Sequence, residues 1–571
     1  MSSSAGTTRP SLSWGWLLLA PLLLALLIAP RQDYVYLEVL FALATVAGCY
    51  IQARTRPKRR AWLPVLPLWA ACLLPALLSI ALRLALLPWI PKPNPAVSDE
   101  FSHRFLAETL LAGRFANPPH PLWRHFESIH ILQQPTYSSM YLFGHAAFLS
   151  AGKLLSGDFF GGVLLETAFF CALLVWFLHA YVPARFAFYG GLIAAVRFGA
   201  ANYWNDSYWG GSAGALGGAL VLGAYARLAR RWSPVPAFLL AAGTVVLLNT
   251  RPFESLGILI PVGVSLLWKI RANLGVAILV GVLALGAFTM TTHWKAVTGS
   301  RLLLPYQLNQ QMYGWPMTLP WFHVRQIEFR HKDLQQYWDF ERQEHRQITE
   351  PAWIPVGILT KMIVFWRFFI GAGLTAALLF APRIIKIRRC RIPWITGAVV
   401  LALAMIEQSG YPHYLSPIAA VIVLFVIQGL RYLAHWQWRG VPLGSAMART
   451  AWIPMSLILA WRVYAGPTPL TGPDSYQYSS WCCQKTGAEE RANVVAQLEA
   501  APGQHLVFVD FLRPKFNTFE WVYNGPDIDG RKVIFARDMG QQKNKELIDY
   551  YPGRHFWRAV VKDKKATLLP Y

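Results

Sequence analysis

The sequence predicts a mainly α-helical, polytopic membrane bundle with a small α/β domain outside the membrane at its C-terminal end. The residues are 55% hydrophobic and only 14% charged, with a mean hydropathy of +0.33. One soluble core does not account for such a composition. In addition, apolar runs long enough to cross a bilayer recur along the chain up to about residue 465. These observations exclude an ordinary cytosolic enzyme.

The distribution of basic residues predicts the orientation. The chain carries 53 Lys and Arg against 29 Asp and Glu, a net charge of +24. The basic residues fall in short clusters between apolar runs, which is typical of cytoplasmic membrane loops rather than of a nucleic-acid surface. We therefore expect a cytoplasmic N-terminus, an outer C-terminus and no nucleic-acid partner. The two densest clusters are Arg54, Arg56, Lys58, Arg59 and Arg60, and Arg383, Lys386, Arg388, Arg389 and Arg391.

About thirteen membrane helices are expected. The first run is kept as an anchor rather than a cleaved signal peptide, because it lacks a clear small-residue cleavage site. Segment 136–155 is assigned to a helix on the outer surface, since counting it as a span would move the basic group at 227–231 outside. The spans are expected at about 13–29, 35–52, 62–90, 161–181, 184–201, 212–228, 235–250, 254–269, 273–291, 353–380, 393–408, 415–430 and 450–465.

Three parts follow from these spans. Residues 1–61 hold two helices and a basic cytoplasmic loop, residues 62–465 form the main membrane domain, and residues 466–571 form the outer domain. The outer loops of the main domain are 91–160 and 292–352, the second of which is expected to be a long polar loop. In the outer domain, helices are predicted over 488–498 and 543–551 and strands over 505–511, 532–536 and 556–561.

The six cysteines predict no zinc site, because none has the required spacing. Four of them lie in or beside spans, where a thiol is most simply a small apolar residue. Cys482 and Cys483 are adjacent in the outer domain, and whether either forms a disulfide stays open.

The first candidate segment for chemistry follows the third span. Ionisable residues beside hydrocarbon are costly, so those gathered at one face of a membrane protein are default functional candidates. Here Asp99, Glu100 and His103 come directly after Ser98. The alternative is a helix start, with Ser98 as cap and two acidic residues favouring the helix dipole.

A second and a third segment lie at later outer boundaries. Asp206, Tyr208 and Trp209 belong to a polar and aromatic stretch, for which an aromatic belt with a turn is the alternative. Asp206 nevertheless needs a partner, a metal or a substrate. Arg251 and Glu254 flank Pro252 between two short helices, where irregular backbone is tolerated only if it is buried or lines a cavity. Their alternative is a structural ion pair.

The fourth segment is a short outer loop with His413 and Tyr414, and the loop 292–352 adds Lys295 as a basic residue for a phosphate. A structural histidine and a solvated lysine are the alternatives. If the helices pack, acids, an arginine, a histidine and aromatics meet at the outer boundary beside lipid. The expected substrate is therefore partly lipid and partly polar.

Over about residues 62–432 the chain resembles the GT-C superfamily of polytopic glycosyltransferases, which take a sugar from a polyprenyl-phosphate carrier on the outer side of a membrane. The resemblance rests on Asp99-Glu100 in the first large outer loop, on the surface helix after Gln133-Gln134-Pro135-Thr136-Tyr137, on the loop with Asp206, and on Thr250-Arg251-Pro252. More closely, the chain is similar to a bacterial subgroup of glycosyltransferase family 39-like, protein mannosyltransferase-like proteins.

The resemblance implies sugar transfer to an acceptor hydroxyl with inversion, and Asp99 as the general base. Glu100 and His103 would orient Asp99 or the acceptor. Arg251, His413 and Lys295 would stabilise the lipid phosphate that leaves. Asp206 would position a sugar hydroxyl or, as in oligosaccharyltransferases, hold a divalent ion. Those enzymes have Asp-X-Asp where this chain has Asn205-Asp206-Ser207, so a reaction without metal or other cofactor is favoured.

The implied partners are a polyprenyl-phosphate-linked sugar, membrane lipid and a periplasmic acceptor, which is a protein, a lipid or a glycan. The implied location is a bacterial inner membrane with the C-terminal domain in the periplasm. Two other classes stay open. A lipid-sugar transporter or flippase also needs polar groups inside a helix bundle, although transporters usually place acids near the midplane and often show inverted repeats. A non-catalytic subunit of an envelope-assembly complex is the third.

Overall fold

The computed structural model describes residues 14–28, 34–55, 63–270, 273–315, 319–321, 325–465, 488–511, 520–562 and 565–571. Most of the basic cluster at 54–60, together with Arg271, Cys482 and Cys483, lies outside these residues. The other four cysteines are free thiols.

A helix occupies each predicted span. The helices of the membrane part are η1 (Trp14–Leu19), α1 (Ala20–Ile28), α2 (Tyr34–Thr55), α3 (Leu68–Ala85), α6 (Phe160–Leu178), α7 (Ala184–Gly199), α8 (Ser212–Leu228), α9 (Pro234–Leu248), α10 (Pro252–Leu267), α11 (Leu274–Thr298), α14 (Ile354–Phe369), α15 (Gly371–Thr375), η3 (Ala376–Phe380), α16 (Ala381–Ile384), η4 (Arg388–Cys390), α17 (Arg391–Ile406), η5 (Pro412–Ile418), α18 (Ala419–Leu433), α19 (Leu443–Thr450) and α20 (Ile453–Ala465).

Fewer of these helices are long enough to cross a bilayer than the sequence predicts. Within the described residues, six are long and apolar enough, or eight if two sharply bent pairs each count as one span. The predicted count of about thirteen is therefore not confirmed. The helix found in segment 136–155, α5 (Phe143–Ser156), is not among the candidate spans, and its place on the surface of the membrane stays a prediction.

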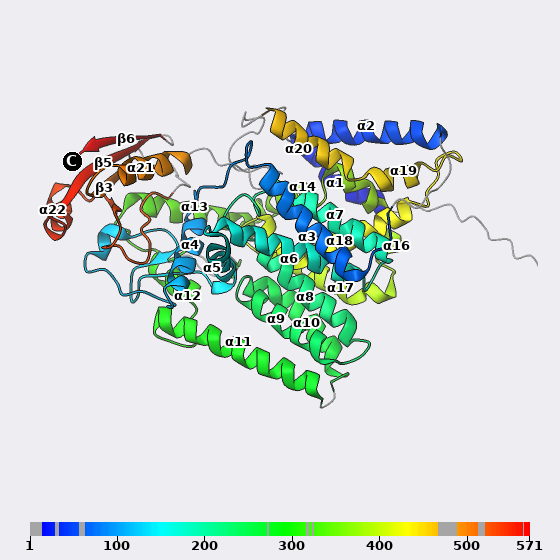
Figure 1. The fold of residues 1–571 in the computed structure, drawn as a ribbon, viewed down its shortest axis with the longest axis horizontal. Coiled ribbons are helices and arrows are strands. Elements are labelled where there is room, and N and C mark those ends of the chain that lie inside the picture. Colours follow the sequence, from blue (N-terminus) through cyan, green and yellow to red (C-terminus); the bar gives the residue numbers. More distant parts are fainter. Residues whose placement is uncertain are drawn as a thin grey trace, which may run out of the picture.

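Small residues let the central helices approach closely. A Cβ on Gly218 of α8 would lie 1.8 Å from the carbonyl oxygen of Pro417 in η5. Only glycine permits this approach, a device common where membrane helices pack. It places η5, which carries His413 and directly precedes α18, against the middle of the bundle. In Figure 1, α6, α7, α8 and α18 lie in the interior, while α11 runs along one side.

The end of the bundle next to the C-terminal unit is built from short elements. They are α4 (Ser98–Leu111), η2 (Trp123–Phe126), a two-stranded ribbon of β1 (Ile131–Leu132) and β2 (Ser138–Ser139), α5, α12 (Pro305–Tyr313) and α13 (Lys332–Thr349). The prediction that residues 292–352 form a long polar loop was wrong, because much of this segment is helical. Helix α11 continues to Thr298, and α12 and α13 follow, with α13 meeting α14 at 102°.

The C-terminal unit contains a four-stranded sheet at one end of the molecule (Figure 1). Its elements are α21 (Ala488–Ala500), β3 (Gln504–Phe511), β4 (Val533–Arg537), α22 (Gln541–Tyr550), β5 (Arg554–Lys562) and β6 (Lys565–Pro570). The strand order is β4-β3-β5-β6, with β3 parallel to β4 and β5 and with β6 antiparallel to β5. The predicted helices and strands are all present, and among the described residues of this unit the sequence reading missed the edge strand β6.

This sheet shares a core with α4 and the segment that follows it. Phe101 and Phe105 of α4 belong to the same buried cluster as Leu506 and Phe508 of β3. Arg537 at the end of β4 is buried and donates from Nε to the carbonyl of Glu127, pairs through Nη1 with Asp333 at the start of α13, and lies 3.5 Å from Glu520. The C-terminal unit therefore holds both the loop before β1 and the helix α13.

Candidate active site

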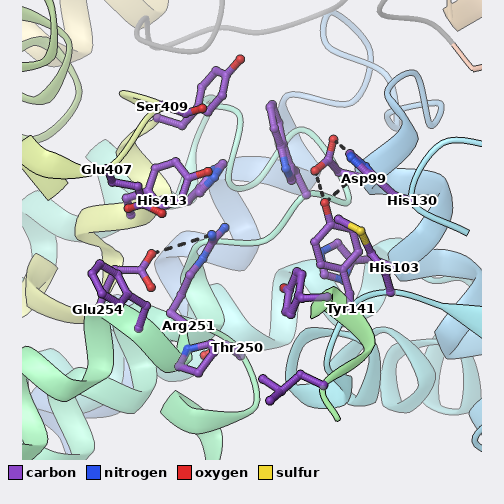
Figure 2. Close-up of a pocket in the computed structure, with 18 of the residues that line it drawn as sticks. Asp99, His103, His130, Tyr141, Thr250, Arg251, Glu254, Glu407, Ser409 and His413 are labelled. Atoms are coloured by element: carbon purple, nitrogen blue, oxygen red, sulfur yellow. Dashed lines mark hydrogen bonds and ion pairs between the residues drawn. The ribbon is translucent and has the colours of Figure 1, made fainter. Parts of the chain in front are cut away.

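A cavity of about 530 Å³ lies where α4, α10, α13 and η5 meet. Asp99, His103, His130 and Tyr141 line one side of it, and Arg251, Glu254, Glu407 and His413 line the other (Figure 2). Tyr337 and Glu341 of α13 also line it. At a further part of its wall are Leu256 of α10 and Met290 and Trp294 of α11. The cavity thus combines carboxylates, one guanidinium and an apolar region in a size suited to a small ligand.

Asp99 reaches this cavity from the first turn of α4. Its side chain is 15% exposed, and Oδ1 accepts a hydrogen bond from the phenol of Tyr141. Oδ2 lies 3.6 Å from Nδ1 of His130. Burial raises the pKa of Tyr141 well above its usual range, and the charge of Asp99 raises it further. Tyr141 therefore stays protonated and orients the carboxylate.

Glu100 does not have the position that the implied role of orienting Asp99 or the acceptor would require. Its Oε2 accepts from the backbone N–H groups of Ala96 and Val97, at 2.9 and 3.0 Å, and its Oε1 accepts from the N–H of Tyr208 at 3.0 Å. The predicted cap is also corrected, because α4 begins at Ser98, Val97 is the N-cap residue, and the capping hydrogen bond comes from Glu100. Glu100 therefore secures the helix that presents Asp99.

His103, one turn further along α4, lines the cavity beside Tyr141. The rings of His103 and Tyr141 stack with centroids 4.2 Å apart, and the ring of His145 meets His103 edge-on at 5.0 Å. Burial lowers the pKa of His103 well below its usual range, and the nearby His145 and Arg251 act in the same direction. A neutral His103 supports the phenol that holds the base.

Asp206 does not line the cavity. Its Oδ1 pairs with Nη2 of Arg83 on α3 at 2.6 Å, and both side chains are fully buried. Arg83 also donates to the carbonyls of Ile90 and Pro91 at 2.8 and 3.0 Å. The partner that a buried carboxylate requires is thus an arginine 123 residues away, and the structure does not support the predicted contact of Asp206 with a sugar.

Of the two aromatic residues predicted beside Asp206, one faces the cavity. Trp209 lines it and packs near His413 and Tyr411, with centroids 5.0 Å from each. Tyr208 lies outside the lining, and its carbonyl accepts from Nε2 of His145 at 2.9 Å. The prediction of a substrate contact therefore agrees with the position of Trp209 and not with that of Tyr208.

Arg251 supplies the cationic group of the cavity. It is the N-cap residue of α10, and Pro252 begins that helix, so the predicted break between two short helices is present. The guanidinium lies 4.9 Å from the ring centre of Tyr414 and 3.9 Å from Oε1 of Glu254. Both partners were predicted site residues, and both line the cavity. The predicted ion pair between Arg251 and Glu254 and a role in binding are compatible here, because 20% of the arginine side chain stays exposed.

His413 faces Arg251 from η5, and two of its nitrogen atoms contact the phenol of Tyr203. Tyr203 Oη accepts from the backbone N–H of His413 at 2.9 Å, and it lies 3.1 Å from Nδ1 of the same residue. In the tautomer in which Tyr203 donates its phenol proton to Nδ1, Nε2–H of the neutral ring is left as a donor. Arg251 and His413 thus lie on one wall of the cavity, and their binding of a phosphate stays a prediction.

Lys295 lies outside the lining of this cavity and is exposed on α11. The neighbouring Trp294 lines the cavity instead, because successive residues on a helix point to different faces. The proposed contact of Lys295 with a phosphate in this cavity is thus not supported.

The sequence reading missed His130, Tyr141, Tyr337 and Glu341. His130 is a lone polar residue between Ile129 and Ile131, and Tyr337 and Glu341 are four residues apart on α13, on one face of the helix. Those two patterns could have indicated the residues from the sequence.

The described residues contain no group of three or more His, Cys, Asp or Glu arranged to hold a metal ion. Whether the reaction needs a metal stays a prediction.

No family model matches the chain, and no curated protein matches it. Among solved structures, it is similar to ArnT from Cupriavidus metallidurans bound to undecaprenyl phosphate, at 11% identity and a TM-score of 0.47, over 88% of this chain and 97% of that one. It is also similar to the apo Archaeoglobus fulgidus oligosaccharyltransferase, at 10% identity and a TM-score of 0.42, over 77% of this chain. The match spans 62% of the length of that archaeal enzyme. These likenesses concern the fold alone, so what the protein does rests on its site.

Proposed function

We propose that the protein is a membrane glycosyltransferase that moves a sugar from a polyprenyl-phosphate carrier to an acceptor hydroxyl at the outer face of a bacterial inner membrane. The observation that carries this proposal is the cavity itself, in which the carboxylate of Asp99 lies across from Arg251 and His413 (Figure 2). A base and an anion-binding pair on facing walls are what a displacement at an anomeric carbon requires.

The apolar region of the cavity supports a lipid-linked donor. Leu256, Met290 and Trp294 line it from α10 and α11, and Leu256 is 45% exposed on the outer surface of the bundle. Helix α11 is a candidate membrane span with few buried residues. A polyprenyl chain would therefore reach the cavity from the bilayer while its phosphate meets Arg251.

In this mechanism Asp99 accepts the proton of the acceptor hydroxyl as its oxygen attacks the anomeric carbon. The bond between that carbon and the phosphate oxygen breaks, and the electron pair leaves on the polyprenyl phosphate. Arg251 and Nε2–H of His413 stabilise the charge that develops there. A single displacement inverts the anomeric configuration. The proposed reaction uses no metal.

The test is transfer from a panel of radiolabelled polyprenyl-phosphate sugars to a crude envelope acceptor, using purified protein in lipid. Asp99→Asn is compared with Asp549→Asn, which changes an exposed aspartate in the C-terminal unit. We expect Asp99→Asn to lose roughly 10²- to 10⁴-fold in rate at unchanged thermal stability, while the control behaves as wild type. Equal transfer by Asp99→Asn and wild type would exclude Asp99 as the base. Absence of transfer by wild type from every donor, with carrier movement across vesicles instead, would favour the flippase alternative.

A further inference from the structure

His130 is held rigidly between the proposed base and helix α13. Its backbone adopts a φ of +64°, a left-handed conformation that non-glycine residues rarely adopt. Its carbonyl accepts hydrogen bonds from Oγ of Ser102 and from the N–H of Met140, at 2.7 and 3.1 Å. The preceding loop is fixed as well, since the N–H of Ile129 donates to Glu520 of the C-terminal unit at 3.1 Å. The surrounding hydrogen bonds thus hold His130 in this strained backbone conformation, as is common at functional sites.

The two ring nitrogens of His130 face different partners. Nδ1 lies 3.6 Å from Oδ2 of Asp99 and 3.3 Å from Oη of Tyr141. Nε2 lies 3.1 Å from Oη of Tyr337 on α13. Tyr337 in turn is hydrogen-bonded to Glu341 one helical turn later. A continuous chain of polar groups therefore runs from Asp99 through His130 and Tyr337 to Glu341.

The hydrogen bonds define the direction of each proton. Tyr141 donates its proton to Asp99, and Tyr337 donates its own to the carboxylate of Glu341. The oxygen of Tyr337 is then an acceptor for Nε2–H of His130, which leaves the lone pair of Nδ1 facing Asp99. Burial lowers the pKa of His130, although the charge of Asp99 opposes this effect, and the neutral ring that the chain requires is favoured.

We infer that His130 and Tyr337 relay the proton that Asp99 takes from the acceptor to Glu341, and so reset the base after each transfer. The inference rests on the proposed function. Protonated Asp99 gives its proton to Nδ1 of His130, Nε2–H of His130 passes to Oη of Tyr337, and the phenol proton passes to the carboxylate of Glu341. One proton enters and one leaves, and every intermediate group regains its starting composition once the tautomer of His130 reverts.

A relay has a purpose in this cavity, because substrates cover the base during turnover. The side chain of Asp99 is only 15% exposed, and that surface faces the space where the sugar binds. Glu341 is partly exposed on α13, and its Oε2 accepts from Nε2 of Gln408 at 2.7 Å. The proton is therefore moved from the reacting carboxylate to a second carboxylate, which lines the cavity from α13.

Rapid-mixing experiments separate a relay from a merely structural role. The variants are His130→Gln and Tyr337→Phe, with His555→Gln and Tyr550→Phe, both exposed, as matched controls. The donor is the radiolabelled polyprenyl-phosphate sugar that the wild type converts fastest. A relay variant still completes its first turnover, because Asp99 starts deprotonated, but it cannot reset. We expect a burst of about one product per enzyme at a nearly wild-type rate, followed by a steady state slowed about tenfold or more. A third variant, His130→Ala, leaves space for free imidazole. We expect added imidazole to raise its steady-state rate toward that of wild type.

Each other outcome overturns the inference. If first and later turnovers slow equally, His130 only positions Asp99. If the steady state of His130→Gln equals that of wild type, the proton leaves by another route. Failure of imidazole to speed His130→Ala, at unchanged thermal stability, has the same meaning. If the wild type transfers sugar from no donor, the proposed function fails and the relay fails with it. If the wild type transfers sugar and the variants turn over at the same rates, the relay alone is excluded.

Discussion

The phenol of Tyr141 donates a hydrogen bond to Oδ1 of Asp99, although the two residues are 42 positions apart in the sequence. Tyr141 follows the ribbon β1–β2, whereas Asp99 is in the first turn of α4. The bond fixes one carboxylate oxygen and leaves Oδ2 toward His130. The orientation of the proposed base therefore depends on how the first outer loop folds back on α4.

Tyr141→Phe tests this orientation. Removal of a donor to a charged group costs about 1.5–3 kcal/mol, so we expect the rate of transfer to fall roughly tenfold to a hundredfold with little change in KM. Steady-state kinetics measure both constants, and Tyr550→Phe is the control. A rate unchanged by Tyr141→Phe would mean that the phenol does not orient the base.

Arg251→Ala removes the guanidinium that faces Asp99 across the cavity. We expect a loss of roughly 10²- to 10³-fold in rate, because the leaving phosphate loses its charged donor, and a smaller loss for Arg251→Lys. Binding of the sugar-free polyprenyl phosphate, measured by titration in lipid, should weaken in parallel. Unaltered binding in Arg251→Ala would assign the arginine a structural role with Glu254.

The buried ion pair between Arg83 and Asp206 predicts a loss of stability rather than of substrate contact. Asp206→Ala leaves the charge of Arg83 unpaired, so thermal unfolding should show about 3–5 kcal/mol of destabilisation. The double variant Arg83→Met with Asp206→Leu should recover most of it, because no charge is then buried alone. Normal thermal stability of Asp206→Ala, together with weakened donor binding, would instead restore the sequence-based role of Asp206.

Arg537 joins the C-terminal unit to the cavity, and its loss should loosen two segments at once. In Arg537→Met, Glu127 and Asp333 lose their shared partner, so amide hydrogen exchange should speed up in 127–132 and 332–341. Transfer should slow as well, because Tyr337 lies in the second segment. Arg558→Met is the control, since that arginine pairs with Asp510 and Asp538 inside the C-terminal unit. Equal rates of amide exchange in Arg537→Met and Arg558→Met would show that Arg537 does not couple the C-terminal unit to the site.

His125 predicts a dependence of stability on pH. Burial lowers its pKa to about 4, with the carboxylate of Glu546 opposing the effect, against about 6.5 in an unfolded chain. Between these two values the unfolded chain binds the proton and the folded protein does not, so stability is lost as pH falls from about 6.5 to about 4. The melting temperature of His125→Gln should fall less over this range than that of wild type. Parallel curves would show that His125 does not contribute.

Local patterns determined most of the secondary structure. Each predicted span contains a helix because membrane helices satisfy their own backbone hydrogen bonds and need only an apolar run. The break at Pro252 and the existence of strands β3, β4 and β5 were likewise predictable, since proline begins a helix and alternating or buried apolar residues indicate strands. Their parallel arrangement was not predicted. Helices α12 and α13 were missed because their sequences are polar, and their few buried apolar residues pack against one another and against Ile129, far away in the sequence.

The sequence by itself also indicated Asp99, His103, Trp209, Arg251, Glu254, His413 and Tyr414, all of which line one cavity. Only the tertiary structure decided what each does. Asp206 forms an ion pair because Arg83 packs beside it from another helix. Glu100 accepts hydrogen bonds from backbone N–H groups. His130 and Tyr337 approach Asp99 from distant segments of the chain. Hydropathy and charge act over a few neighbouring residues, whereas the partner of a buried polar group is chosen by packing between residues that the chain order does not place together.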